Sequence, residues 1–404
     1  MSDRRRRAET DADRPAIRVA VLINGVGLRL AKGRLLLAVV DRLVARGYAV
    51  DVLVHDPPAW LAARLPAEAR AVDISRVWER WLPPRQLGKM GVYLSLAALV
   101  RYLRRERPAV LLAGSIPPNV TALLARRLAG VATRIVLRQS NVVAIPGDPD
   151  CGGVRARPRD RLVRRLYREA DAIVAVSRGV ADNTARLPGV TGERVHTVLT
   201  GYDGRVPRWS CARPEQPWLS DGGPPVILNV ARYVAKKDQA TLLRAFARVA
   251  ATRDARLLIL GRDGPERRRL AALAAELGVA ERVALGAFTD NPYAAMARAR
   301  VFVLSSVSEG MPSVVLEALA CGCPVVSTDC PSGPREVLAD GAFGRLVPVR
   351  DPATLAEAIT ATLDAPPDPE RLRTHAAQHT ITRAAEAYAD VVADQVLAGM
   401  AACR

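Results

Sequence analysis

The sequence predicts an α/β protein made of two doubly wound domains in succession. Its 404 residues, half of them hydrophobic, are enough for two hydrophobic cores of about 200 residues each. Apolar strands alternate with amphipathic helices in two series, the first starting at Ile17 and the second at Val226. Between them, residues 207–225 are rich in Pro, Gly and polar side chains, which is typical of an interdomain linker.

The first series opens with a strand over residues 17–24, followed by Gly25-Val26-Gly27. An amphipathic helix then runs to Arg46 and stops at Gly47, and a second strand covers residues 49–55. This is the start of a βαβ unit. Residues 1–15, polar and highly charged, predict a disordered tail.

The most informative segment carries Glu309 and Glu317, which lie eight residues apart between an apolar strand, residues 301–304, and an apolar helix. Pro312 suits the first position of that helix. A carboxylate at Glu317 can accept both hydroxyls of a ribose cis-diol, and Glu309 is free to meet a second polyol. The alternative is that Glu309 caps the helix and Glu317 is a solvated helical residue.

The same helix start predicts an anion site. Free backbone N–H groups at Met311, Ser313 and Val314, together with the helix dipole, favour negative charge such as that of a diphosphate. Gly310 lets the backbone approach a ligand closely. Two carboxylates around one anion site therefore indicate a sugar nucleotide.

A second signal is the basic loop after the apolar strand that ends at Val230. Arg232 and Lys237 follow this strand, and open α/β sheets bind ligands at such strand ends. The chain has only four lysines among its 59 basic residues, and two of them, Lys236 and Lys237, are adjacent here. A compact ammonium group is a suitable point charge for phosphate, although a solvated basic turn would give the same pattern.

With these motifs the chain resembles the retaining nucleotide-sugar glycosyltransferases called family 4, most of all the bacterial surface-glycan hexosyl and N-acetylhexosaminyl transferases. Glu309 and Glu317 resemble the E-x7-E motif of that family, and Arg232 with Lys237 resembles its donor-diphosphate pair. The resemblance is dense over residues 226–359. It implies the GT-B fold: two Rossmann-like domains facing each other across a cleft, with a C-terminal helix crossing back to the first domain.

The implied organisation is a tail at residues 1–15, an acceptor-side domain at 16–207, a nucleotide-sugar-binding domain at 208–380 and a returning helix at 381–404. The implied catalytic residues are Glu309, which contacts the donor sugar, and Arg232 and Lys237, which stabilise the leaving diphosphate. Glu317 is expected to hold the ribose. The turn that would line the diphosphate consists of Gly310, Met311, Pro312, Ser313 and Val314.

The N-terminal half departs from the family pattern. Gly25 is expected near the donor phosphate, but Gly25 and Gly27 are separated where relatives have a Gly-Gly pair. Residues 137–141, Leu-Arg-Gln-Ser-Asn, contain no histidine where many relatives carry one, so no catalytic histidine is predicted. Residues 198–203 lack the Asn-Pro that many relatives have at this place.

Charge distinguishes the two halves. Residues 1–200 hold 35 Lys and Arg against 18 Asp and Glu, whereas residues 201–404 hold 24 against 23. A net charge of +17 in the acceptor-side half predicts an anionic membrane surface or a lipid-diphosphate acceptor as partner. Residues 85–107 resemble a basic interfacial helix, and residues 155–168 form a second basic segment. The alternative is a surface that simply carries many arginines.

The composition disfavours several classes of protein. Aromatic residues make up only 4%, which argues against base-stacking nucleic-acid platforms. Six irregularly spaced cysteines do not form a disulfide framework, and Cys321, Cys323 and Cys330 lack a fourth nearby ligand, so no metal site is predicted. No segment reaches about 18 uninterrupted apolar residues, and no signal peptide is predicted.

These features predict a cytoplasmic retaining hexosyltransferase, peripheral on the inner face of the membrane, that uses a UDP-sugar as co-substrate and needs no metal or other cofactor. Two alternatives stay open. One is an epimerase of UDP-N-acetylhexosamine with the same fold; the other is a non-catalytic basic protein that binds glycan or nucleic acid. The donor sugar, the acceptor, its linkage and the oligomeric state are not specified by the sequence.

Overall fold

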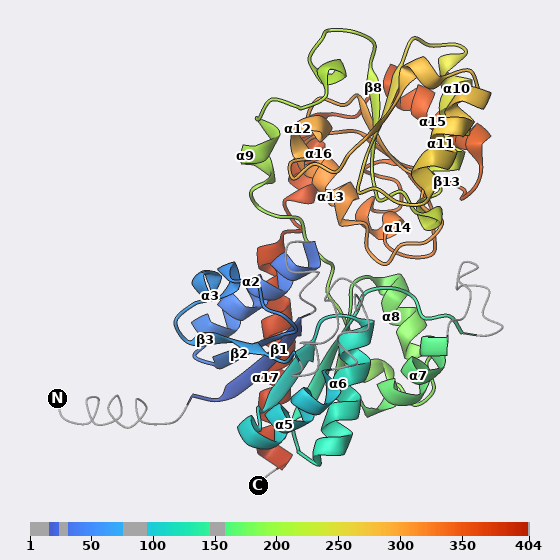
Figure 1. Cartoon of the computed structure of the whole chain (residues 1–404). Coiled ribbons are helices and arrows are strands. Elements are labelled where there is room, and N and C mark those ends of the chain that lie inside the picture. Colours follow the sequence, from blue (N-terminus) through green and yellow to red (C-terminus); the bar gives the residue numbers. More distant parts are fainter. Residues whose placement is uncertain (1–15, 24–30, 76–94, 146–157, 403–404) are drawn as a thin grey trace. The chain divides into compact units, whose positions relative to one another are not determined.

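The structure of the protein is a computed structural model, and it describes residues 16–23, 31–75, 95–145 and 158–402 (Figure 1). The chain forms two compact units. The first contains residues 1–138, 162–174 and 385–404, and the second contains residues 139–161 and 175–384. Each unit contains most of one sheet.

The N-terminal sheet has seven strands in the order β3-β2-β1-β4-β5-β6-β7. The strand pairs from β3 to β5 are parallel. The strands are β1 (Arg18–Ile23), β2 (Ala49–Val54), β3 (Ala69–Asp73), β4 (Val110–Ala113), β5 (Arg134–Gln139), β6 (Ala172–Ala175) and β7 (Val195–Thr197).

Helices connect these strands in chain order and cover the sheet, which buries β1, β2, β4 and β5 almost completely. They are α2 (Ala31–Ala45), α3 (Trp60–Arg64), α5 (Leu96–Glu106), α6 (Ile116–Ala129), α7 (Pro158–Leu166) and α8 (Arg178–Ala185), with short 3₁₀ turns η6 (Tyr167–Glu169) and η7 (Gly192–Arg194).

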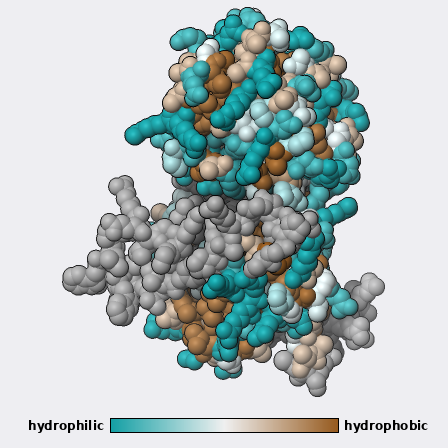
Figure 2. All heavy atoms as spheres, turned by 90° about the vertical axis from the view of Figure 1, so that its right-hand side faces the viewer, coloured by the Kyte–Doolittle hydropathy of each residue, from teal (hydrophilic) through white to brown (hydrophobic). Residues whose placement is uncertain are grey.

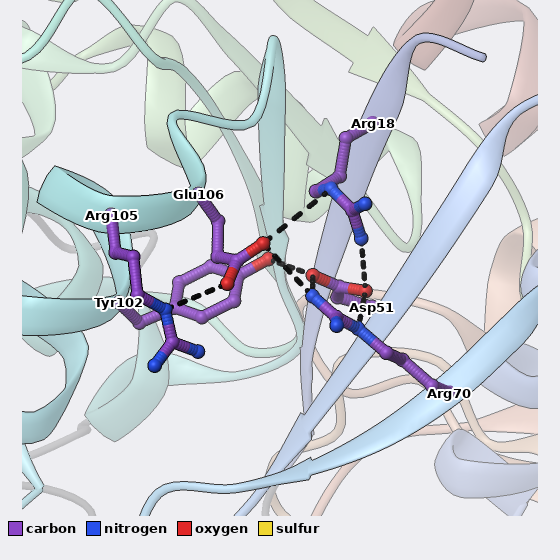
Figure 3. A network of polar contacts seen from close by, with 6 residues as sticks. All are labelled: Arg18, Asp51, Arg70, Tyr102, Arg105 and Glu106. Atoms are coloured by element: carbon purple, nitrogen blue, oxygen red, sulfur yellow. Dashed lines mark hydrogen bonds and ion pairs between the residues drawn. The ribbon is translucent and has the colours of Figure 1, made fainter. Parts of the chain in front are cut away.

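A polar network joins three neighbouring strands of this sheet to α5 (Figure 3). At its centre Asp51, fully buried on β2, accepts two bonds from Arg70 of β3, at 2.7 and 3.0 Å, and one from Arg18 of β1 at 2.9 Å. The Tyr102 hydroxyl donates to Asp51 Oδ2 at 2.6 Å. Glu106, also on α5, accepts from Arg70 at 2.9 Å. A buried charge with this many partners ties α5 to the sheet.

The last helix, α17 (Ile381–Ala402), packs on the first unit (Figure 1). Arg46 at the end of the first crossover is ion-paired with Glu386 and, at 2.7 Å, with Asp390. Arg134 donates to Gln395 Oε1 at 2.9 Å. The predicted return of the C-terminal helix to the first domain is therefore confirmed.

The second sheet has six strands, all paired in parallel, in the order β10-β9-β8-β11-β12-β13. They are β8 (Val226–Val230), β9 (Arg256–Leu260), β10 (Val283–Gly286), β11 (Val301–Leu304), β12 (Val325–Thr328) and β13 (Arg345–Val347). β11 has the bounds expected from the sequence.

Helices cover both faces of this sheet and close two hydrophobic cores (Figure 1). They are α9 (Val206–Ser210), α10 (Gln239–Ala250), α11 (Glu266–Glu276), α12 (Tyr293–Met296), α13 (Ser313–Ala320), α14 (Pro334–Val337), α15 (Pro352–Asp364) and α16 (Pro369–Ala376), with 3₁₀ turns η8 (Pro217–Leu219), η9 (Ala235–Lys237) and η10 (Ala280–Arg282).

The segment expected to be a linker is packed rather than free. It contains α9 and η8, and Leu219 is buried in the core on one face of the second sheet. Trp209 and Trp218 pack against the same core. Burial of these apolar side chains explains why the segment folds with the second unit despite its Pro- and Gly-rich composition.

Hydrophilic and hydrophobic residues are interspersed on the face of the second unit drawn in Figure 2. Among the described residues, no helix combines the length and apolar composition needed to cross a membrane.

Candidate functional site

The second sheet brings the two sequence motifs together. Its strand order reverses between β8 and β11: the chain builds outward from β8 to β9 and β10, and then returns to add β11 on the other side. Arg232 and Lys237 follow the carboxyl end of β8, and Glu309 follows the carboxyl end of β11. In open α/β sheets the ligand crevice lies at this switch point. Parallel pairing of β8 with β11 therefore explains why motifs about 75 residues apart form one site.

The centre of the site is an ion pair between Lys237 and Glu309. The Lys237 ammonium donates to Glu309 Oε1, and the Ser306 hydroxyl donates to the same oxygen at 2.6 Å. Both charged side chains are largely buried, with 13% of Lys237 and 8% of Glu309 exposed. Glu309 therefore does not cap the helix, as one reading of the sequence suggested, but holds a lysine of the neighbouring loop.

Glu309 is anionic in this setting. Burial raises the pKa of its carboxyl, but the charges of Lys237 and Lys236 and the bond from Ser306 outweigh burial, so the pKa lies below its usual value. Both described bonds go to Oε1. Oε2 has no partner within the described ranges, so this oxygen can accept a hydroxyl from a ligand.

The basic loop is anchored by its main chain. The Val307 N–H donates to the Lys236 carbonyl at 3.0 Å, and the Ser305 hydroxyl donates to the Lys237 carbonyl at 2.9 Å. On the β9 side, a Cβ at Gly261 would overlap the Ala231 carbonyl oxygen, so only glycine permits this approach. The position of the loop is therefore fixed by the strand ends on both sides of it.

The start of α13 carries part of the predicted anion site. Pro312 precedes the helix instead of occupying its first position, because α13 begins at Ser313. The Ser313 N–H donates to the Met311 carbonyl at 3.0 Å, so it is not available to an anion. Within the part of the chain that is described, the N–H groups of Met311 and Val314 have no acceptor, so two of the three expected donors are available.

A serine outside the predicted set fixes the turn before α13. The Ser332 hydroxyl donates to the carbonyls of Glu309, at 2.8 Å, and of Gly310, at 3.3 Å. Its effect is to hold these two carbonyls, and with them the turn that precedes α13, in one position. The sequence offered no signal for this contact, because Ser332 follows a different strand.

Glu317 lies on α13 and is largely buried, with 8% of the residue exposed. The Tyr293 hydroxyl, from α12, lies 3.4 Å from Glu317 Oε1. The alternative interpretation of Glu317, as a solvated helical residue, is therefore wrong. Gly25, the remaining predicted site residue, lies outside the described residues.

A cavity of about 230 Å³ opens at the carboxyl ends of β9 and β10. Its walls include Leu258 and Leu260 of β9, Gly286 of β10, and Thr289 and Asn291 from the following loop. The cavity is on the sheet edge that carries Arg232 and offers apolar walls with polar groups at its rim, which suits a ring with hydrogen-bonding edges.

The three cysteines considered as metal ligands are buried thiols. Burial raises the pKa of Cys321 and of Cys330 to about 12, and it also raises the pKa of Cys323. Across the described ranges no group of three or more His, Cys, Asp or Glu is placed to hold a metal ion. Deprotonated thiolates are needed for zinc binding, so these positions favour packing.

Two sheets of parallel strands, each wound on both faces and joined by a returning C-terminal helix, define the GT-B fold. A solved structure agrees. The crystal structure of Anabaena HepE in complex with UDP and glucose superposes with a TM-score of 0.73 at 16% identity, covering 94% of this chain and 100% of that one.

Family comparisons identify the chain more closely. Residues 213–379 match the family model described as "Glycosyl transferases group 1", and residues 33–201 match "Glycosyl transferase 4-like domain". The two models together span most of the chain, which belongs to the family 4 glycosyltransferases.

Two curated bacterial relatives are similar over part of their length. One is the N-acetylgalactosamine-N,N'-diacetylbacillosaminyl-diphospho-undecaprenol 4-alpha-N-acetylgalactosaminyltransferase of Campylobacter jejuni, 32% identical over 61% of this chain and 65% of the relative. The other is the lipopolysaccharide core biosynthesis glycosyltransferase LpsE of Rhizobium meliloti, 36% identical over 48% of this chain and 54% of the relative. The chain thus spans less than two thirds of each relative.

Proposed function

We propose that this protein is a retaining glycosyltransferase that transfers a hexose or N-acetylhexosamine from a UDP-sugar to a glycan or lipid-linked acceptor in bacterial surface-glycan synthesis. One observation carries the proposal: at the switch point of the second sheet, Arg232, Lys237 and Glu309 follow the carboxyl ends of two paired strands, and Glu309 directly precedes a helix start with available amides. Cations and amides suit a diphosphate, and a buried carboxylate with one open oxygen suits a sugar hydroxyl.

The donor would lie along the strand ends. The cavity beside β9 and β10 would take the base, Glu317 the ribose, and the Met311 and Val314 amides with Arg232 the diphosphate. Glu309 Oε2 would accept a hydroxyl of the donor sugar. This order follows the geometry of the sheet edge, where the base cavity and the helix start lie on opposite sides of β8.

In the proposed reaction the bond between the donor sugar and the diphosphate breaks as the acceptor hydroxyl attacks on the same face of the sugar. Negative charge develops on the leaving diphosphate, and the fixed cations and helix amides stabilise this charge more strongly in the transition state than in the ground state. The positive side chains at this site would supply the charge stabilisation without a metal ion.

The acceptor would bind to the basic first unit. On α5, Arg101, Arg104 and Arg105 are exposed, while Leu99 and Leu103 are buried. This arrangement supports binding to an anionic membrane surface, at the cytoplasmic face, or to a lipid-diphosphate acceptor. The names of the two bacterial relatives, one acting on a diphospho-undecaprenol and one in lipopolysaccharide core synthesis, support an acceptor of this kind.

The proposal is tested by thermal shift of the purified protein against a panel of nucleotide sugars, followed by donor turnover with membrane-extracted lipid acceptors. A bound donor should raise the melting temperature, because a ligand that binds only the folded state stabilises it. The Glu317→Gln variant should lose donor binding, whereas Glu357→Gln, an exposed position on α15, should not.

Three outcomes would contradict the proposal. No response to any nucleotide sugar would exclude this donor class, and unchanged donor turnover in Glu317→Gln would exclude the proposed site. Conversion of the donor to its epimer in the absence of acceptor would instead establish the epimerase. Anomeric analysis of the product by NMR tests retention.

A further inference from the structure

A second cavity lies in the second unit, where α13 packs against α9, α12 and α16 (Figure 1). Its volume is about 840 Å³, which is within the range of small-molecule sites. Its walls include Ala320 and Cys321 at the carboxyl end of α13, whereas the candidate donor site is at the start of the same helix. A helix of eight residues is about 12 Å long, so the two sites are distinct.

Tyr202 brings a buried hydroxyl to this cavity. The residue lines the cavity and is only 7% exposed. Its N–H donates to the His379 carbonyl, and its carbonyl accepts from the Ile381 N–H, so its main chain is fully used. In the described parts of the chain the hydroxyl has no hydrogen-bond partner. A buried polar group of this kind is costly unless a ligand completes it, which points to a bound molecule.

Two arginines from different segments supply positive charge. Arg298, just after α12, donates from Nη1 to the carbonyls of Ser210 and Ala294, both at 3.0 Å. Arg373 of α16 donates from Nη1 to Glu370 Oε2 at 3.1 Å. Within the described ranges the Nε and Nη2 groups of both arginines make no hydrogen bond. The two side chains are thus held in place and keep donors for an anionic group.

The guanidinium of Arg373 lies against the end of α13. Gly322 follows this helix with φ +74°, and a Cβ there would be 2.8 Å from Arg373 Nη2. Burial raises the pKa of Cys321 to about 12, and the charge of Arg373 opposes this effect, so the two side chains are close. A cation at this place offsets the negative end of the helix dipole, which would otherwise repel an anion.

The other walls suit a sugar ring. Ala297, Ala320 and Ala377 contribute apolar surface, while Thr374 and Glu370 add a hydroxyl and a carboxylate. Apolar surface beside a few donors and acceptors can hold the faces and the hydroxyls of a ring. Two arginines against one glutamate give the lining a positive charge, so a negatively charged ligand is favoured.

We propose that this cavity binds an acidic saccharide, that is, a sugar that carries a carboxylate or a phosphate group. Arg298 and Arg373 would bind the anionic group, and hydroxyls of the ring would bond to Tyr202, Thr374 and Glu370. The site would give the protein a hold on acidic glycan apart from the place of transfer. This inference goes beyond the proposed function and does not depend on it.

The test is calorimetric titration of the full-length protein with glucuronate, glucose 6-phosphate, glucose and inorganic phosphate. At least one of the two acidic sugars should bind. Glucose and inorganic phosphate should bind at least about tenfold more weakly, because each lacks one part of the ligand. Arg373→Met should weaken binding of the acidic sugar by roughly ten- to a hundredfold, because a hydrogen bond to a charged group is lost.

Two control variants should bind the acidic sugar like wild type. Arg268→Met changes an exposed position on α11, and Arg232→Met changes an exposed cation of the candidate donor site. The first tests for a general effect of net charge. The second tests whether the sugar binds at the donor site instead.

Tyr202→Phe separates ligand binding from folding. It removes only the hydroxyl and keeps the ring that packs in the core of the second unit. The variant should melt at the wild-type temperature, because no hydrogen bond to the described residues is lost. It should bind the acidic sugar about two- to tenfold more weakly, because one neutral hydrogen bond to the ligand is lost.

Four results would overturn the inference. They are no binding of either acidic sugar, equal affinity for the acidic sugar and for glucose or inorganic phosphate, wild-type affinity in both Arg373→Met and Tyr202→Phe, and loss of binding in Arg232→Met with retention in Arg373→Met. None of these results concerns nucleotide-sugar binding, so the proposed function would stand.

Discussion

The buried carboxylate Asp51 gives the sharpest stability prediction. Replacing it with Asn keeps the shape of the side chain but removes the charge that faces Arg18, Arg70 and the Tyr102 hydroxyl. Breaking a fully buried ion pair on one side costs about 3–5 kcal/mol. Arg18 and Arg70 can be partly hydrated, since 34% and 51% of their side chains are exposed, and Arg70 keeps its bond to Glu106.

Because of that hydration, we expect Asp51→Asn to lower the free energy of unfolding by about 2–3 kcal/mol. For a unit of this size, about 2–4 °C in melting temperature corresponds to each kcal/mol, so the midpoint should fall by about 4–12 °C. Circular dichroism during thermal and urea unfolding measures both quantities. The control is Arg105→Gln, because Arg105 is 69% exposed and its bond to Glu106 should contribute less than about 1 kcal/mol.

The difference in stability between the wild type and Asp51→Asn should depend on pH with a definite sign. Burial raises the pKa of Asp51, but the bonds from Arg70 and Tyr102 and the charge of Arg18 lower it more, so the folded pKa is below the usual value. A lowered carboxyl pKa stabilises the fold above the unfolded pKa of about 3.9 and loses that effect as the pH falls further. The wild-type advantage over Asp51→Asn should be constant at neutral pH and shrink below about pH 4. If the free energies of unfolding of the wild type and Asp51→Asn differed by less than about 0.5 kcal/mol at pH 7, the reasoning would be refuted.

Three further predictions concern the second unit. Gly261→Ala should destabilise the protein by about 3 kcal/mol, because its Cβ meets the Ala231 carbonyl, while Gly192→Ala, with open space around its Cβ, should change denaturation midpoints little. Burial, with nearby positive charge, lowers the pKa of His379, so stability should fall as the pH drops below about 6.5, and His379→Gln should flatten that slope in pH-dependent melts. Alkylation of the native protein followed by peptide mapping should label the exposed Cys211 and spare the three buried cysteines; equal labelling would contradict their burial.

Local patterns were sufficient for the fold class and for the chemistry of the candidate residues. Alternating strands and helices predict two parallel sheets, because hydrophobic strands of about five residues joined by amphipathic helices can bury both faces only in that way. The types of residue at Arg232, Lys237, Glu309 and Glu317 predict phosphate and polyol binding, because charge and hydrogen-bonding capacity belong to each side chain.

Other features depend on which strands become neighbours. No local signal shows that β8 pairs with β11, and only this pairing brings the Lys237 ammonium onto Glu309. Likewise the sequence does not show that Ser332 fixes the turn after Glu309, since the two residues follow different strands. Sequence alone thus determined the elements and the donor and acceptor groups they carry. Tertiary structure decided which charges neutralise each other, because electrostatic pairing depends on distances across the sheet and on burial.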